Sequence, residues 1–218
     1  MGMCCAKGNN KRNEGVMITI EELLSADYSD KKPLTMDDLR IVLSRMLILE
    51  YNMKLYDKRN LQAQRARVLK TGLSEKYVEL VRETRKLDDD ISSAVKTQVL
   101  EDYKTPSESF EASITSFNAK ETAEAALMNL HKGIRENRKK LGLSESAAVN
   151  LVRGYQNAFD KCNFMLNSSP GFAKQLSELY DENQRVNYIE LTTADSLYNE
   201  FNLLPIEMLA FIEDNESH

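Results

Sequence analysis

The sequence predicts an all-α fold, with a long antiparallel helical hairpin over residues 35–104 and shorter packed helices over residues 107–218. Three observations support this prediction. Apolar residues recur at alternating steps of three and four, which is the spacing of an amphipathic helix. The 218 residues include only 8 glycines and 4 prolines, so long segments are free of helix breakers. No segment alternates apolar and polar residues as a half-buried strand does.

Residues 1–34 are predicted to form a flexible N-terminal segment, because residues 7–15 are small or polar and have no periodic pattern. Within this segment, Thr19 and Glu22 have the spacing of a capping box and indicate the start of a short helix.

The first arm of the hairpin begins at Thr35, where Asp38 completes a capping-box spacing, and it ends at Gly72. Its apolar stripe has the spacing of coiled-coil packing and consists of Leu39, Val42, Met46, Leu49, Met53 and Tyr56. The chain restarts at Ser74, and the second stripe consists of Tyr77, Leu80, Thr84, Leu87, Ile91 and Ala94. The connection is so short that the two arms must run antiparallel. Pro106 ends the hairpin.

Shorter helices follow the hairpin, each opened by a recognisable start signal. A short helix carries Phe110 and Ile114, and the next opens with a capping box at Asn118. Another follows the LSES sequence of residues 143–146. Ser169 and Pro170 then begin a helix with proline at the favoured first position. The last apolar segments are residues 197–204 and 206–212, with Pro205 between them.

Charge is distributed unevenly along the chain. Residues 41–86 contain eleven basic and five acidic residues, a net charge of +6, whereas residues 172–218 contain two basic and ten acidic residues, a net charge of −8. This asymmetry allows the chain to fold back on itself, and it equally allows the basic half to meet an anionic surface.

The N-terminal sequence MGMCCAKGNNKR predicts a lipid anchor. Gly2 follows the initiator methionine as in N-myristoylated proteins, although Ala6 stands where that motif has serine or threonine. Cys4 and Cys5 are candidates for palmitoylation, which would supply the second signal that stable anchoring requires. The nearby basic residues would be attracted to anionic lipid: Lys7, Lys11 and Arg12. The alternative is an unmodified leader.

A second membrane-binding element is predicted on the first arm. At 100° per residue, Lys54, Lys58 and Arg65 fall within about 40° of one another on a continuous helix, away from the apolar stripe. A helix with one apolar and one cationic face can pack and bind an anionic membrane at the same time. The alternative is a solvated face. Nucleic acid is not expected as a partner, because the basic segment offers few aromatic residues for base stacking.

Catalytic and cofactor-binding patterns are absent from the sequence. The two histidines, His131 and His218, have no metal-ligand spacing to a cysteine or to each other. No glycine-rich phosphate-binding motif occurs. We therefore expect neither an enzyme nor a metal or cofactor site. Nor does any apolar run reach the roughly 18 residues that a membrane-spanning helix needs.

The layout resembles that of ESCRT-III subunits, the charged multivesicular body protein family. The residues that carry the resemblance are the hairpin segment KLYDKRNLQAQRARVLKTGLSEKYVELVRETRKL, the third-helix segment AEAALMNLHKGI and the acidic C-terminal segment ADSLYNEFNLLPIEMLAFIEDNE. Gly2 matches the myristoylated branch of that family. The segment RENRKKLGLSES is an apparent insertion, and LLPIEML only faintly matches the family's motif for its recycling ATPase. The resemblance implies that an acidic C-terminal region folds over the hairpin and that its release allows polymerisation on a membrane.

The sequence thus predicts a cytoplasmic, peripheral membrane protein at an endosomal, plasma or flagellar membrane. Its expected function is membrane remodelling or protein sorting by self-assembly. Its expected partners are an anionic membrane surface and other helical subunits, copies of itself among them. The alternative is a lipid-anchored helical adaptor or cytoskeletal or flagellar scaffold that does not polymerise. A soluble helical bundle without a membrane role is a third possibility.

Overall fold

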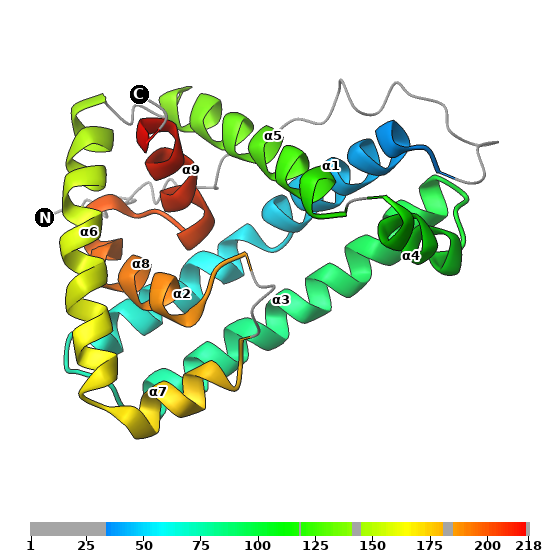
Figure 1. Ribbon diagram of the computed structural model, residues 1–218. Helices are drawn as coiled ribbons and strands as arrows, with labels where there is room; N and C mark the ends of the chain where they lie inside the picture. The colour runs from blue at the N-terminus through cyan, green and yellow to red at the C-terminus, as the bar shows by residue number, and fades with distance from the viewer. Residues whose placement is uncertain (1–33, 118, 141–144, 181–184, 217–218) are drawn as a thin grey trace, which may run out of the picture.

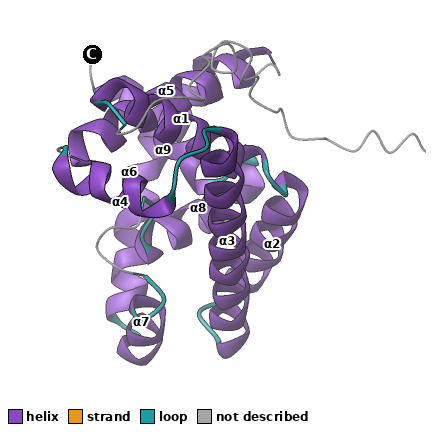
Figure 2. Cartoon of the chain, turned by 90° about the vertical axis from the view of Figure 1, so that its right-hand side faces the viewer, coloured by secondary structure: helices purple, strands orange, loops and turns teal. Residues whose placement is uncertain are grey.

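The computed structural model describes residues 34–117, 119–140, 145–180 and 185–216. Within these ranges the chain forms helices and no strand, as predicted (Figure 2). The helices are α1 (Met36–Asn52), α2 (Leu55–Leu69), α3 (Glu75–Asp102), α4 (Ser107–Ser116), α5 (Ala119–Lys140), α6 (Glu145–Asn167), α7 (Pro170–Ser177), α8 (Tyr188–Phe201) and α9 (Pro205–Glu216).

The predicted hairpin is present. Helices α1 and α2 follow one another along the first arm, and both pack against α3, which returns in the opposite direction as the second arm (Figure 1). Gly72 makes the turn with φ of +106°, a conformation that favours glycine because it has no Cβ. Ser74 then caps α3, since its hydroxyl accepts from the Tyr77 amide at 3.4 Å.

The capping box at the start of the first arm is confirmed. The Thr35 hydroxyl accepts from the Asp38 amide at 3.2 Å, and the Asp38 carboxylate accepts from the Thr35 amide at 3.0 Å. These bonds satisfy two backbone groups that a helix N-terminus otherwise leaves unpaired. The capping sequences expected at residues 19–22, 118 and 143–144 lie outside the described residues.

The first arm is not one continuous helix, and that part of the prediction is wrong. It breaks between α1 and α2, where Met53 is extended and Lys54 has a left-handed φ of +51°. The break turns α2 relative to α1, so Tyr56, expected in the apolar stripe, is 71% exposed. The buried face of α2 consists instead of Leu55, Gln62, Arg65, Ala66 and Leu69.

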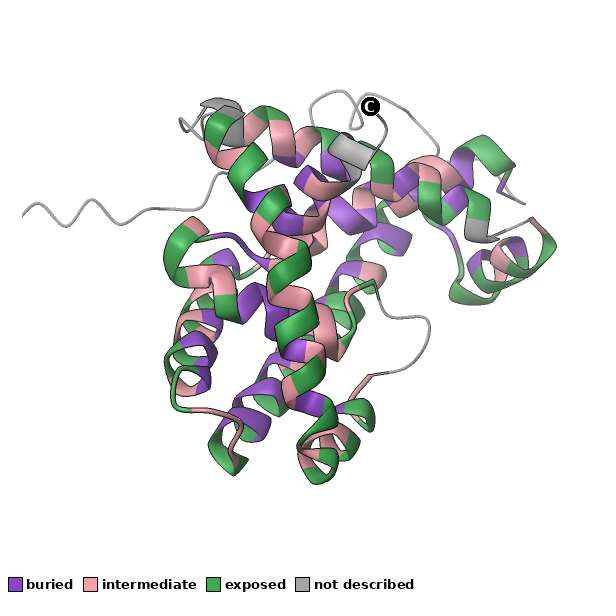
Figure 3. Cartoon of the chain, turned by 60° about the vertical axis from the view of Figure 1, so that its left-hand side comes forward, coloured by how far each residue is buried: buried purple, intermediate pink, exposed green. Residues whose placement is uncertain are grey.

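The remaining helices cover the hairpin. Helix α5 lies along α1, while α6 packs against α8 and α9 and also contacts α7. Ser169 and Pro170 begin α7 as predicted, although the Ser169 side chain makes no capping bond. Buried residues follow the facing sides of the helices, and the outward sides are exposed (Figure 3).

The two C-terminal helices return to the basic arm. Helix α8 lies against α2, and α9 lies against α5 and α6. The two segments of opposite net charge are therefore in contact, as the charge asymmetry allowed. The seam between α2 and α8 contains a buried polar network, and it is the candidate functional site.

Candidate functional site at the hairpin and C-terminal interface

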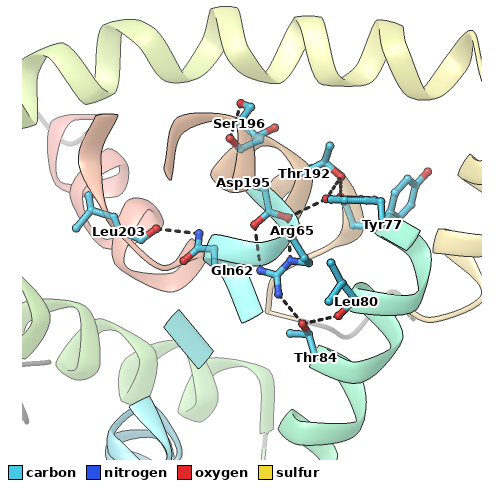
Figure 4. A network of polar contacts seen from close by, with 11 residues as sticks. Gln62, Arg65, Tyr77, Leu80, Thr84, Thr192, Asp195, Ser196 and Leu203 are labelled. Carbon is cyan, nitrogen blue, oxygen red and sulfur yellow. Dashed lines mark hydrogen bonds and ion pairs between the residues drawn. The ribbon is translucent and has the colours of Figure 1, made fainter. Parts of the chain in front are cut away.

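A fully buried ion pair joins the first arm to α8. Arg65 on α2 is 2% exposed and Asp195 on α8 is 0% exposed. The guanidinium donates two hydrogen bonds to the carboxylate, from Nε to Oδ2 at 2.8 Å and from Nη2 to Oδ1 at 3.0 Å (Figure 4). This two-pronged geometry fixes both the rotation of α2 and the register of α8 against it.

The second arm completes this network. The Arg65 Nη1 group donates to the Thr84 hydroxyl, which itself donates to the Leu80 carbonyl at 2.8 Å. The Tyr77 hydroxyl donates to Asp195 Oδ2 at 2.9 Å and lies 3.2 Å from the Thr192 hydroxyl. Side chains from α2, α3 and α8 therefore meet at one buried carboxylate (Figure 4).

Burial is the largest single influence on the pKa of each of these groups. It raises the pKa of Asp195, and the adjacent Arg65 opposes that rise. Burial alone would lower the pKa of Arg65, but Asp195 more than offsets this effect and the pKa is raised. Burial also raises the pKa of Tyr77 well above 10.0, and the carboxylate of Asp195 adds to the increase. The guanidinium is thus held in its charged form with the carboxylate beside it.

A second buried carboxylate joins the first arm to α9. Glu207 is 0% exposed, and its Oε1 atom accepts from the Tyr51 hydroxyl at 2.7 Å and from Arg59 Nη2 at 2.7 Å. Its Oε2 atom accepts from the Leu204 amide at 2.6 Å, which caps the start of α9. Gln62 adds a bond from its amide nitrogen to the Leu203 carbonyl at 3.0 Å.

A cavity of about 350 Å³ lies beside these contacts, between the two arms. Its charged walls consist of four bases, Lys58, Arg65, Arg85 and Arg185, and three acids, Glu50, Asp88 and Asp89, and Arg65 is paired with Asp195 outside the lining. Two of the bases pair directly with acids, since Arg185 contacts Glu50 at 2.8 Å and Arg85 contacts Asp89 at 3.0 Å. Burial lowers the pKa of Lys58 and raises that of Asp88. The charges of the lining are thus largely compensated by one another and by Asp195.

The predicted basic face on the first arm is wrong for this conformation. Lys54 is exposed, but the Lys58 ammonium turns inward and donates to the Glu50 carbonyl, and Arg65 is buried against Asp195. The helical-wheel argument assumed a continuous helix, whereas the chain breaks at Lys54. The exposed basic residues of the first arm beyond the break are instead Arg67 and Lys70.

The remaining predicted site residues lie outside the described residues: Gly2, Cys4, Cys5, Lys7, Lys11 and Arg12. Among the described residues, no three histidine, cysteine, aspartate or glutamate side chains are grouped so that they could hold a metal ion. No helix in the described ranges is long and apolar enough to cross a membrane.

Sequence reasoning missed Asp195 and Glu207, the two carboxylates that organise the interface. A signal was present in both cases. Asp195 follows the small, uncharged residues 192–194, and Glu207 lies among the apolar residues 203–212. An acid in such a setting is costly to bury unless it is paired, so each one indicates a basic partner elsewhere in the fold.

The fold and this interface define a class of protein: an all-α protein whose helical hairpin is closed by its own C-terminal helices. Comparison with models of known protein families, with curated proteins and with solved structures finds no match.

Proposed function

We propose that this protein is a membrane-associated helical protein that assembles with copies of itself and thereby remodels membranes or sorts proteins, as ESCRT-III subunits do. The observation that carries the proposal is the polar character of the seam between the hairpin and α8. A permanent helix interface gains little from a buried ion pair, since apolar residues of similar volume are often as stable or more stable. Arg65 and Asp195 instead give a fixed register to an interface that can open and re-form.

Opening of this interface supplies the surface for assembly. With α8 displaced, α2 presents a face that combines apolar residues with an unpaired arginine, namely Leu55, Gln62, Arg65, Ala66 and Leu69. Another copy of the chain offers the matching acidic helix. Closure therefore competes with assembly, and the ion pair holds the free subunit in the closed form.

Membrane attachment in this proposal comes mainly from the N-terminal segment. A single myristoyl chain at Gly2 gives only marginal residence, and acylation of Cys4 or Cys5 makes it stable. Lys7, Lys11 and Arg12 add attraction to anionic lipid, on the order of 1 kcal/mol for each base near the surface. Of the three cations first predicted on the arm, Lys54 alone is exposed in the closed form.

Vesicle sedimentation followed by negative-stain imaging tests the proposal. Full-length protein, myristoylated enzymatically during expression, is mixed with vesicles of phosphatidylcholine with and without phosphatidylserine. We expect pelleting with the anionic vesicles, loss of pelleting in Gly2→Ala, and filaments or spirals on the membrane. Asp195→Asn should assemble more readily than the wild type, whereas the matched control Asp90→Asn, at an exposed position on α3, should not.

The images also distinguish the proposal from its rivals. Bound but unassembled protein, in both the wild type and Asp195→Asn, would contradict self-assembly and indicate a lipid-anchored adaptor or scaffold. Absence of myristate incorporation, together with no pelleting, would contradict the membrane role itself.

A further inference from the structure

The break in the first arm lies where the sequence has no helix breaker. Kinks in helices normally occur at proline, at glycine and serine pairs, at π-bulges or where a side chain inserts into the backbone hydrogen bonds. Residues 51–56, YNMKLY, contain no proline, glycine or serine, and yet Lys54 takes a left-handed φ of +51°. That conformation is unfavourable for a residue with a Cβ. Side-chain contacts made by Lys58 and by Glu207 are therefore the candidates for holding the arm in its broken form.

The break also leaves backbone groups without helical partners. The last backbone hydrogen bond of α1 is made by the Met53 amide, which donates to the Leu49 carbonyl at 2.8 Å. The next bond of this type joins the Lys58 amide to the Lys54 carbonyl at 3.1 Å. The amides of residues 54–57 lie between these two bonds. A continuous helix would give these amides carbonyl partners four residues earlier.

Glu207 is positioned to oppose this straightening. Its Oε1 atom accepts from Tyr51, before the break, and from Arg59, after it, each at 2.7 Å. In a straight helix these residues are about 12 Å apart along the axis, and both side chains lean toward the N-terminus. In the interrupted arm, a single oxygen atom of Glu207 instead joins the two helices across the break.

Lys58 makes a second contact that depends on the break. Its ammonium donates to the Glu50 carbonyl, which in a continuous helix would accept from the amide of residue 54. The side chain thus replaces a backbone donor that the break removed.

We propose that Glu207 is a conformational latch for the first arm. While α9 is docked, its carboxylate joins Tyr51 to Arg59 and keeps α1 and α2 as separate helices. When α9 leaves, both residues are released and residues 36–69 form one continuous helix. The docking of the C-terminal helices therefore sets the shape of the arm, in addition to covering its surface.

Distance measurement between two spin labels tests the latch without any membrane or partner. Labels are placed at two exposed positions, Asp37→Cys on α1 and Arg67→Cys on α2, in full-length protein whose three native cysteines are replaced. A continuous helix separates these positions by about 45 Å, since 30 residues rise 1.5 Å each. We expect a single distance that differs from this value in the latched protein, and a second population near 45 Å in Glu207→Ala.

Substitutions at Lys54 provide matched controls, because this side chain is exposed and lies at the break. In the Glu207→Ala background, Lys54→Gly should reduce the long-distance population, since glycine tolerates a positive φ and disfavours a helix interior. Lys54→Ala should increase it, since alanine has the opposite preferences.

An unchanged distance distribution in Glu207→Ala would overturn the latch, as would a population near 45 Å that already dominates in the latched protein. If circular dichroism shows that Glu207→Ala does not fold, Tyr51→Phe and Arg59→Met take its place. Each removes one of the two donors to Glu207 Oε1, so the carboxylate no longer joins the two helices, and an unchanged distribution in both variants would overturn the proposal equally. Because these measurements use no lipid, failure of the latch leaves the proposed membrane function standing, and the reverse also holds.

Discussion

Replacing Asp195 with alanine should destabilise the protein strongly, because it leaves a buried arginine without its counter-charge. Arg65 is 2% exposed and would lose both of its hydrogen bonds to the carboxylate. Removing one partner of a buried pair costs about 3–5 kcal/mol. A single domain has a free energy of unfolding of roughly 5–15 kcal/mol, so this loss is a large fraction of the total.

The double variant Arg65→Met with Asp195→Leu removes both charges. It therefore distinguishes the cost of leaving one buried charge unpaired from the net contribution of the ion pair to the free energy of unfolding. The neighbouring hydroxyls keep partners in this variant, since Thr84 still bonds to the Leu80 carbonyl and Tyr77 still lies 3.2 Å from the Thr192 hydroxyl. We therefore expect the double variant to be more stable than Asp195→Ala by several kcal/mol and within about 2 kcal/mol of the wild type.

Urea denaturation followed by far-ultraviolet circular dichroism measures these differences in the full-length protein. The surface pair Lys76–Glu79, whose side chains are 60% and 55% exposed, provides the control. Lys76→Ala should change the free energy of unfolding by less than about 1 kcal/mol. The reasoning is refuted if Asp195→Ala costs no more than Lys76→Ala, or if the double variant is as unstable as Asp195→Ala.

Three further predictions concern individual residues. Lys54→Gly should raise the free energy of unfolding by about 1 kcal/mol, because glycine adopts the left-handed conformation at the break without steric strain. A lower denaturation midpoint in Lys54→Gly than in Lys54→Ala would show that this residue is not strained. Thr35→Ala should cost about 0.5–2 kcal/mol through loss of the α1 cap, with Thr71→Ala, at an exposed turn position, as the control; equal costs would argue against the capping box. Because burial raises the pKa of Tyr77, the unfolded state releases this proton first, so stability present below about pH 10 is lost as pH rises above it. Urea midpoints measured against pH should fall less steeply in Tyr77→Phe than in the exposed control Tyr56→Phe, and equal slopes would contradict this.

Periodicity predicted the hairpin well where apolar residues alone make the contact. Leu39, Val42 and Met46 were expected in one stripe and are all buried. On the second arm the stripe through Tyr77, Leu80 and Ile91 is buried as well. These residues face a partner helix with side chains of the same kind, so the pattern alone identifies the face.

The prediction failed where the buried face is polar. Arg65 was expected on an exposed basic face, but it is buried together with Gln62. Long polar side chains of this kind are rarely buried. Their burial depends on Asp195 and the Leu203 carbonyl, more than 100 residues away along the chain. Hydrophobic periodicity contains no information about such pairings. It could not locate the break at Lys54 either, because the contacts that hold the break come from Glu207 on α9.

The charge asymmetry was the sequence feature most informative about the site. It indicated that the acidic C-terminal segment and the basic arm can meet, and the two are in contact through Arg65–Asp195 and Arg59–Glu207. The same asymmetry also suggested a cationic surface for lipid, which burial of Arg65 removes in the closed form. Net charge identifies complementary segments, but it does not distinguish an internal partner from an external one.

Native-state hydrogen exchange is the most direct test of the claim that α8 and α9 close the hairpin as a unit that can open. We expect the amides of residues 188–212 to exchange in the wild type with a lower opening free energy than those of residues 77–100 of α3. Equal opening free energies in the two segments would mean that the C-terminal helices open only when the whole protein unfolds, and this result would contradict the claim.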